Sequence, residues 1–87
     1  MKIKKGFILK EIAGSFVVVA IGPAVKDFNG AISLNSVGAT LWKALEHDNT
    51  VDGLIQLLLD EYQVDYDKAK VDVENFVNKL KEANLVE

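Results

Sequence analysis

The side chains that could perform chemistry are few. His47 is the only histidine, and it lies between Glu46 and Asp48 at the expected end of a helix. A protonated imidazole is favourable at a helix C-terminus, so this position is explained without catalysis. The chain has no cysteine, which excludes a thiolate nucleophile, a disulfide and a cysteine metal site. His47 with its acidic neighbours also lacks the spacing of a metal-binding motif.

The other polar candidates lack the partners that catalysis needs. Acid pairs such as Asp65 and Asp67 lie at expected helix ends, where capping and solvation account for them. The six glycines form neither a GxGxxG motif nor a P-loop. No second histidine or lysine-based motif accompanies the serines at 15, 33 and 36. We therefore expect no enzyme, no catalytic residue, no metal and no cofactor.

Composition bounds the class of protein. Eighty-seven residues, 49% of them hydrophobic, make a single domain over residues 1–87. The net charge of −3 is uneven, because residues 1–43 carry +4 and residues 44–87 carry −7. There is no secretion signal, and the longest apolar run, "FVVVAI", is far below the roughly 20 residues of a membrane span. We expect a cytoplasmic protein that does not enter a membrane.

Three strands are expected in the first part of the chain. Residues 7–12 and 16–21 form a hairpin around the turn at 13–15, and the second run is apolar throughout, as in a strand covered on both faces. Gly22-Pro23 ends it. Val25 and Phe28 of the connector are expected to pack on the core, and Asn29-Gly30 turns the chain into a third strand at 31–34.

Three helices follow. The first runs from about Ser36 to Glu46, capped by Asn35 or Ser36, and its Gly38 indicates that another group packs very close. Thr50 caps the second and Asp65 the third, which ends near Ala83. The third helix has one apolar face, formed by Ala69, Val73, Phe76, Val77 and Leu80. The fold class is α+β, a three-stranded antiparallel sheet followed by three helices with a winged helix-turn-helix-like outline.

That outline permits nucleic-acid binding, which is the alternative function. Arginine, the residue that dominates phosphate and guanine recognition, is absent. The third helix carries five acidic residues against four lysines, and the second carries acids only. Such helices would be repelled by a phosphate-lined groove, so we do not expect nucleic acid as a partner.

Peptide binding is the other class to consider. The strand at 31–34, "AISL", has no charge or proline to protect an open edge, and such an edge can accept an extended peptide as an added strand. If the third helix lies alongside, the two elements form the walls of a groove. Two flanks of the helix are available, with Asp72, Lys79 and Ala83 on one side and Tyr66, Lys70 and Lys81 on the other. On the residues alone, plain solvent exposure is the favoured interpretation of all six.

The segments "GFILKEIAGSFVVVAIG", "DFNGAISLNSVGATLW" and "YQVDYDKAKVDVENFVNKLKEANLV" together closely resemble the PqqD family, the recognition elements of ribosomally made, modified peptides. The most specific piece is Leu34-Asn35-x-x-Gly38-x-x-x-Trp42, supported by Asp72-Val73-x-x-Phe76 and Leu80. One departure is Asn84, where such sequences usually have glycine; both residues tolerate the left-handed conformation.

The resemblance implies a non-catalytic protein that binds the leader of a precursor peptide as a further strand beside the third one. It also implies a separate modifying enzyme, often a radical S-adenosylmethionine protein, to which the peptide is presented. Carried over by position, the pairing strand is Ala31, Ile32, Ser33 and Leu34, and the helix wall is Asp72, Asn75, Phe76 and Lys79. Phe76 could instead serve the core alone. The peptide, its modification and whether the pathway makes pyrroloquinoline quinone stay open, as does the choice between monomer and weak dimer.

Overall fold

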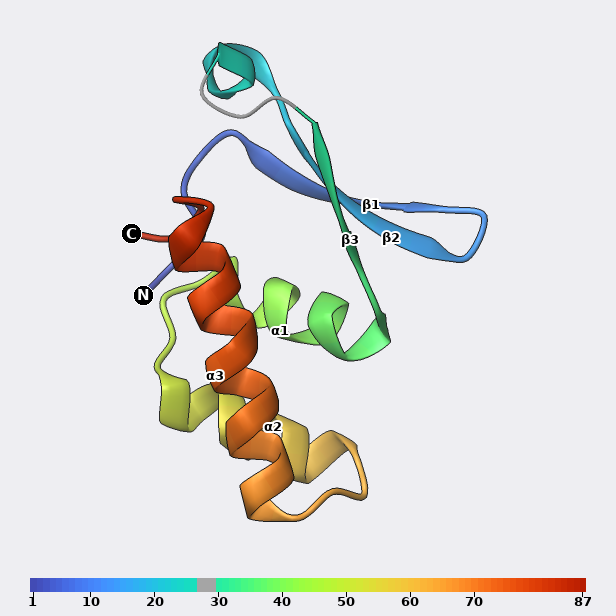
Figure 1. Cartoon of the computed structure of the whole chain (residues 1–87), viewed down its shortest axis with the longest axis vertical. Helices are drawn as coiled ribbons and strands as arrows, with labels where there is room; N and C mark the ends of the chain where they lie inside the picture. Colours follow the sequence, from blue (N-terminus) through green and yellow to red (C-terminus); the bar gives the residue numbers. More distant parts are fainter. Residues whose placement is uncertain (27–29) are drawn as a thin grey trace.

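The computed structural model describes residues 1–26 and 30–87 (Figure 1). Its elements confirm the expected order of a three-stranded antiparallel sheet followed by three helices. In chain order they are β1 (Phe7–Ile12), β2 (Ser15–Ala20), the 3₁₀ helix η1 (Gly22–Lys26), β3 (Ala31–Leu34), α1 (Ser36–Leu45), α2 (Val51–Glu61) and α3 (Tyr66–Glu82).

The β1–β2 turn is shorter than the sequence suggests. Ser15 pairs with Ile12 and belongs to β2, so the turn consists of Ala13 and Gly14 instead of three residues. Both turn residues have positive φ, 51° and 80°, as a two-residue turn that matches the strand twist requires.

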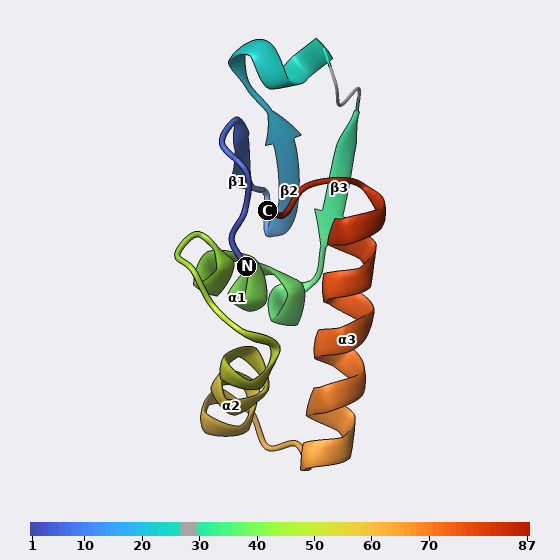
Figure 2. The same ribbon diagram turned by 90° about the vertical axis from the view of Figure 1, so that its left-hand side faces the viewer.

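One face of the sheet packs on the helices, and the other does not. Val18 of β2 is fully buried against the helices, while Val17 and Val19, which point the opposite way, are only half-buried. The expectation that β2 is covered on both faces is therefore wrong. The reason is topological, because α1 and α3 lie on the same side of the sheet (Figure 2).

The segment after β2 also differs from expectation. Residues 22–26 form η1, and Val25 is 53% exposed instead of packing on the core. A 3₁₀ turn this short buries none of its residues, so its valine has no apolar surface to cover it. The predicted core position of Phe28, and Asn29 of the predicted Asn29-Gly30 turn, lie outside the described residues.

The helices begin where the capping residues indicate. The side-chain oxygen of Asn35 accepts a hydrogen bond from the Gly38 amide at 2.8 Å, so Asn35 is the cap of α1. Thr50 and Asp65 cap α2 and α3 in the same way. Each cap satisfies an amide that the first helical turn leaves unpaired.

The core lies between the sheet and the helices. α1 lies in the middle of the molecule, with the sheet on one side and α2 on the other (Figure 2). α3 extends alongside all of these layers, from β3 past α1 to α2 (Figure 2). Trp42 is fully buried within α1, and the expected apolar face of α3 is buried. The largest fully buried side chains are Trp42, Leu41, Leu45, Leu54, Leu58, Leu80, Leu85, Val18 and Val73.

The two chain ends are tied together beside α1. Asn84 has a φ of 60°, and the Leu85 amide donates to the Leu80 carbonyl at 2.9 Å, which closes α3 and turns the chain back. Ile3 and Val86 then form an antiparallel bridge. Leu85 is fully buried as a result.

Candidate functional site

β3 is an edge strand whose backbone has one unpaired side. It pairs with β2 and, among the residues that the structure describes, with no other strand. Its residues carry no charge, and no proline interrupts it. An edge of this kind offers free amide and carbonyl groups to another extended chain.

The register of the hairpin fixes which residues of β2 face β3. The Ile21 amide donates to the Gly6 carbonyl at 2.7 Å, so Ile21 forms a hydrogen-bonded pair with the segment leading into β1. In an antiparallel ladder these pairs alternate along the strand. The odd-numbered residues of β2 therefore bond to β1, and the even-numbered residues bond to β3.

The same alternation then assigns the backbone groups of β3. Val18 of β2 lies opposite Ile32, so the amide and carbonyl of Ile32 point toward β2. The amides and carbonyls of the neighbouring residues Ala31 and Ser33 point away from β2, toward the open edge of the sheet. The side chains alternate as well, with Ile32 packed on the core and Ser33 exposed on the face away from the helices.

A groove of about 360 Å³ lies between the end of β3 and α3. One wall is the end of β3, the floor is the first part of α1, and the other wall is a single stripe of α3. The lining residues are Ser33, Leu34, Asn35, Val37, Gly38, Leu41, Lys68, Asp72, Asn75, Phe76 and Lys79.

The floor of the groove depends on Gly38. A Cβ atom added there would lie 3.3 Å from the Leu34 Cβ and 3.5 Å from Cε1 of Phe76. The glycine thus lets β3, α1 and α3 meet at one point, which is the close packing that the sequence predicts. The floor and the Phe76 side of the wall are apolar, which suits an apolar side chain of a guest.

The polar wall of α3 carries two lysines that differ in whether they are paired with a carboxylate. Lys68 forms an ion pair with Asp72 in which Nζ lies 2.8 Å from both carboxylate oxygens. Lys79 is exposed, and no carboxylate of a described residue lies within ion-pair distance of it. Lys79 is therefore available to attract a carboxylate on a guest, whereas the charge of Lys68 is already neutralised.

Six of the eight residues proposed from the sequence come together in this groove, namely Ser33, Leu34, Asp72, Asn75, Phe76 and Lys79. Ala31 and Ile32 do not line it; Ala31 is exposed further along the edge, and Ile32 packs on the core. Phe76 belongs to both environments, because it is 8% exposed and lies in the core cluster and in the groove wall.

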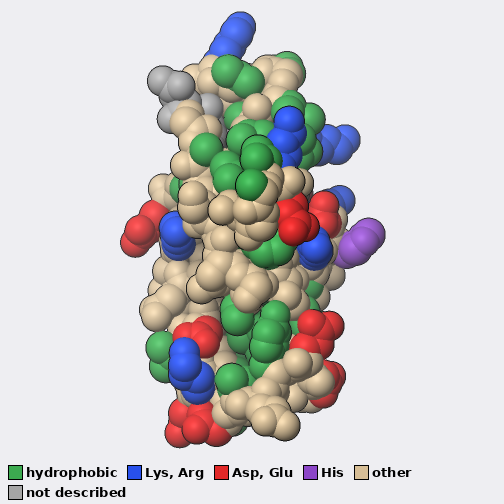
Figure 3. Space-filling model, turned by 90° about the vertical axis from the view of Figure 1, so that its right-hand side faces the viewer, with side chains coloured by type: hydrophobic (Ala, Val, Ile, Leu, Met, Phe, Trp, Pro, Cys, Tyr) green, Lys and Arg blue, Asp and Glu red, His purple; other side chains and the backbone are tan. Residues whose placement is uncertain are grey.

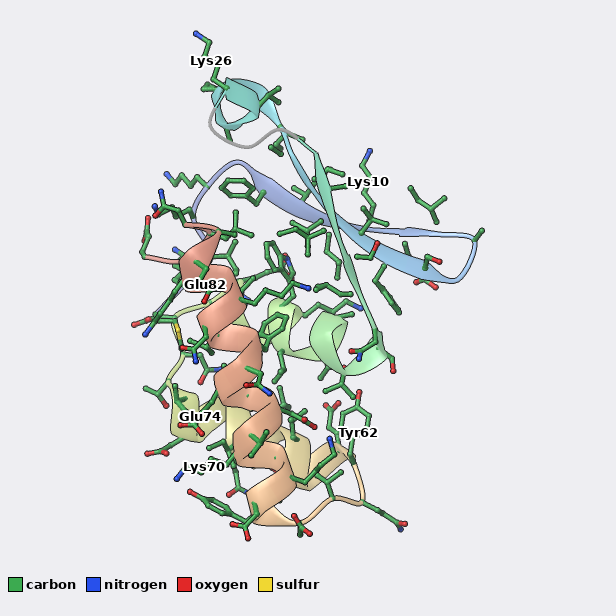
Figure 4. The ribbon with its side chains drawn as sticks, viewed as in Figure 1. Lys10, Lys26, Tyr62, Lys70, Glu74 and Glu82 are labelled. Atoms are coloured by element: carbon green, nitrogen blue, oxygen red, sulfur yellow. The ribbon has the colours of Figure 1, made fainter. Side chains whose placement is uncertain are left out.

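The structure also separates the two flanks of α3. Asp72 and Lys79 face the groove, while Tyr66, Lys70 and Lys81 do not line it. Figure 4 shows Lys70 and Glu74 projecting on the side of α3 away from β3. Ala83 lies beyond the groove and packs on the core cluster.

Five lining residues were missed from the sequence. Lys68 could have been found, because it precedes Asp72 by four residues and so lies on the same stripe of α3. The other four lining residues, from the cap and first part of α1, could not have been found from the sequence. Nothing in their pattern shows that this helix lies beneath the strand edge. They are Asn35, Val37, Gly38 and Leu41.

Two other kinds of feature are missing from the part of the chain that the structure describes, a metal-binding cluster and a membrane-spanning helix. Within residues 1–26 and 30–87, no three His, Cys, Asp or Glu side chains are grouped to hold a metal ion. None of the described helices combines the length and the apolar character needed to cross a membrane. His47 is exposed beyond the end of α1.

The fold and the groove define a small winged helix-turn-helix-like domain with an open strand edge beside a helix. The family model of coenzyme PQQ synthesis protein D (PqqD) matches residues 16–86. The chain therefore belongs to the PqqD family. No curated protein matches it.

Two solved structures share the fold. One is TbiB1 in complex with the TbiA(beta) leader peptide, with a TM-score of 0.78 and 23% identity over 100% of this chain and 95% of that one. The other is lasso peptide synthetase B1 complexed with the leader peptide, with a TM-score of 0.74 and 20% identity over 97% and 93% of the two chains.

Proposed function

We propose that this protein is a non-catalytic, cytoplasmic peptide-binding module. It captures the leader of a ribosomally made precursor peptide by β-strand addition and presents it to a modifying enzyme. The observation that carries the proposal is the unpaired edge of β3 beside the groove. Membership of the PqqD family and the leader peptides bound by the two structural neighbours support it.

In this proposal the edge and the groove have separate tasks. The outward amides and carbonyls of Ala31 and Ser33 bind the guest backbone, which gives affinity with little dependence on sequence. Guest side chains that lie opposite Ile32 and Leu34 point toward the groove, because a new strand keeps the pleat of the sheet. The α3 wall of Asp72, Asn75, Phe76 and Lys79 then selects among them.

Capture of the leader aids the modifying enzyme through local concentration. A peptide held on a protein that also binds the enzyme keeps its modifiable part near the catalytic centre, at an effective concentration that can reach about the millimolar range. The partner enzyme that we expect from the family resemblance is a radical S-adenosylmethionine protein. Nucleic-acid binding gains no support from the comparisons.

Ser33→Pro, with Ser33→Ala as its matched control, tests strand addition directly. Proline removes the outward amide donor without touching the bonds to β2, whereas alanine removes only the exposed hydroxyl. The measurement is calorimetric titration with the leader peptide of the precursor encoded beside the gene. We expect Ser33→Pro to weaken binding about tenfold or more and Ser33→Ala to bind like the wild type.

Two controls make the result decisive. Circular dichroism must show that Ser33→Pro keeps the wild-type helix content, because the substitution lies in an edge strand. Affinity should fall only modestly with salt, in contrast to the steep loss of a phosphate-binding protein. A folded Ser33→Pro variant with unchanged affinity would rule out the β3 edge as the binding site.

A further inference from the structure

The sheet has a second surface that shares only Ser33 with the groove. We infer that this outer face docks the modifying enzyme, through a partner surface that is apolar at its centre and carries carboxylates at its rim. The inference rests on the proposed function, because it names the place where the enzyme meets the recognition protein. The outer sheet face consists of Ile8, Lys10, Ile12, Ser15, Val17, Val19, Ala31 and Ser33, and Ile21 continues it beyond β2.

The outer sheet face is largely apolar, and its members are all exposed or half-buried in the part of the chain that the structure describes. The register places its members on the opposite side from Val18, which is buried under the helices. Ile12 is 57% exposed and Ile21 46%, and both are among the most exposed large hydrophobic residues described. In Figure 3, hydrophobic side chains are visible over both the sheet half and the helical half of the molecule. Contiguous exposed apolar surface of this kind marks interaction sites in small proteins.

The described residues of the outer sheet face and of η1 carry charge of one sign. Lys10 is the only charged member of the outer sheet face, and Lys26 of η1 lies at its end. Figure 4 shows Lys10 and Lys26 both projecting away from the helices. A partner that presents carboxylates opposite these lysines would be electrostatically complementary, which favours encounter and fixes orientation.

The same charge argues against a second copy of this chain as the occupant. A symmetric dimer through the outer sheet face would bring the same patch together twice and place lysines against lysines. An anionic membrane is also disfavoured, because membrane-binding patches carry about four to eight basic residues, whereas the outer sheet face and η1 carry only Lys10 and Lys26. A separate acidic protein surface meets neither objection.

The outer sheet face would also continue onto a bound peptide. Guest residues that pair with Ala31 and Ser33 place their side chains on the same side of the sheet as those two residues. The enzyme would then contact the recognition protein and the captured leader at once. We therefore expect the enzyme to bind the peptide-loaded protein more tightly than the free protein.

Ile12→Thr and Lys10→Glu test the docking surface, and Val71→Thr is the matched control. Val71 is 52% exposed on α3, close to the 57% of Ile12, and lies outside both the groove and the sheet. The purified modifying enzyme encoded beside the precursor gene is titrated into each variant, with and without the leader peptide. We expect Ile12→Thr and Lys10→Glu to weaken enzyme binding about tenfold, Val71→Thr to leave it unchanged, and all three to keep wild-type affinity for the peptide.

The outcomes separate this inference from the proposed function. If the variants bind peptide and enzyme like the wild type, the docking inference is wrong while strand addition stands. If the wild type binds no peptide, the proposed function fails and the docking inference fails with it. Self-association in sedimentation velocity that Ile12→Thr abolishes would assign the face to a second copy. Binding to phosphatidylcholine vesicles containing phosphatidylglycerol, lost in Lys10→Glu, would assign it to a membrane.

Discussion

Gly38 of α1 approaches Leu34 of β3 so closely that a Cβ added to the glycine would lie 3.3 Å from the Leu34 Cβ. The contact joins the open strand to the helix beneath it, and Phe76 of α3 closes the same point at 3.5 Å. The distance between the strand edge and α3 thus depends on residue 38 being glycine, which has no side chain.

Gly38→Val should destabilise the protein and weaken peptide binding. The added methyl groups would crowd Leu34 and Phe76, and such overpacking costs about 1–3 kcal/mol. Gly38→Ala is the milder companion, because a gain of about 1 kcal/mol in helix propensity opposes two tight contacts of the new Cβ, with Leu34 Cβ and Asn35 Oδ1, each at 3.3 Å. Urea unfolding and peptide titration of both variants measure the two effects. A Gly38→Val variant as stable as the wild type would show that the contact has room to relax.

Lys79→Glu should weaken binding of a leader that carries an acidic residue near the groove. The substitution replaces the unpaired cation with a charge that repels the guest, so we expect about tenfold lower affinity, with a smaller difference at high salt. Lys70→Glu is the matched control, because it makes the same change on the side of α3 away from β3 (Figure 4). Equal losses in the two variants would indicate a general charge effect and no contact at Lys79.

Asn84→Val should be less stable than Asn84→Gly. Asn84 has a φ of 60°, which glycine adopts freely and which costs a β-branched residue about 1–2 kcal/mol. The asparagine also accepts a hydrogen bond from Lys4 Nζ at 2.6 Å, so glycine loses one exposed contact. Thermal unfolding followed by circular dichroism compares the variants. Equal melting temperatures would mean that the turn after α3 adapts its backbone.

Asp48 should contribute to the stability of the protein at neutral pH and lose this contribution in acid. Its carboxylate accepts a hydrogen bond from the Met1 ammonium at 2.7 Å, and this bond together with the ammonium charge lowers the pKa of Asp48 from 3.8. Because the pKa of Asp48 is lower in the folded state, the pair's contribution to the free energy of unfolding is present above pH 3.8. That contribution is lost as the pH falls through the pKa that Asp48 has in the folded protein. The difference in melting temperature between the wild type and Asp48→Asn should therefore shrink on acidification.

Blocking the amino group tests the same pair from the other side. Acetylation of Met1 removes its charge, so it should lower the melting temperature at neutral pH and add to Asp48→Asn only what the 2.8 Å bond from the ammonium to the Asn49 carbonyl contributes. Because Asp48 is highly exposed, with 83% of its side chain accessible, we expect both effects to be small. Additive losses would show that the two groups do not act as a pair.

Much of the fold can be predicted from the sequence because local chemistry determines it. Asn35, Thr50 and Asp65 can each satisfy a first-turn amide, so they fix where the helices begin. The four-residue strand after Gly30 and the buried stripe of α3 follow from the periods of strands and helices. Two wrong expectations, the covered β2 and the buried Val25, concern what packs above a face, which a local pattern does not contain; the third, the length of the β1–β2 turn, is an error of one residue at an element boundary.

The sequence by itself determined the elements, their caps and the unguarded strand, since each depends on residues close together in the chain. The helical period leaves both flanks of α3 open, and only the tertiary structure shows that Asp72 and Lys79, which the family resemblance favours, line the groove while Lys70 and Lys81 do not. A helical wheel leaves the two flanks of an apolar stripe equivalent, and only the packing of α3 against α1 and β3 distinguishes them. For the same reason the start of α1 became the floor of the groove, and one apolar face of the sheet was left without a cover.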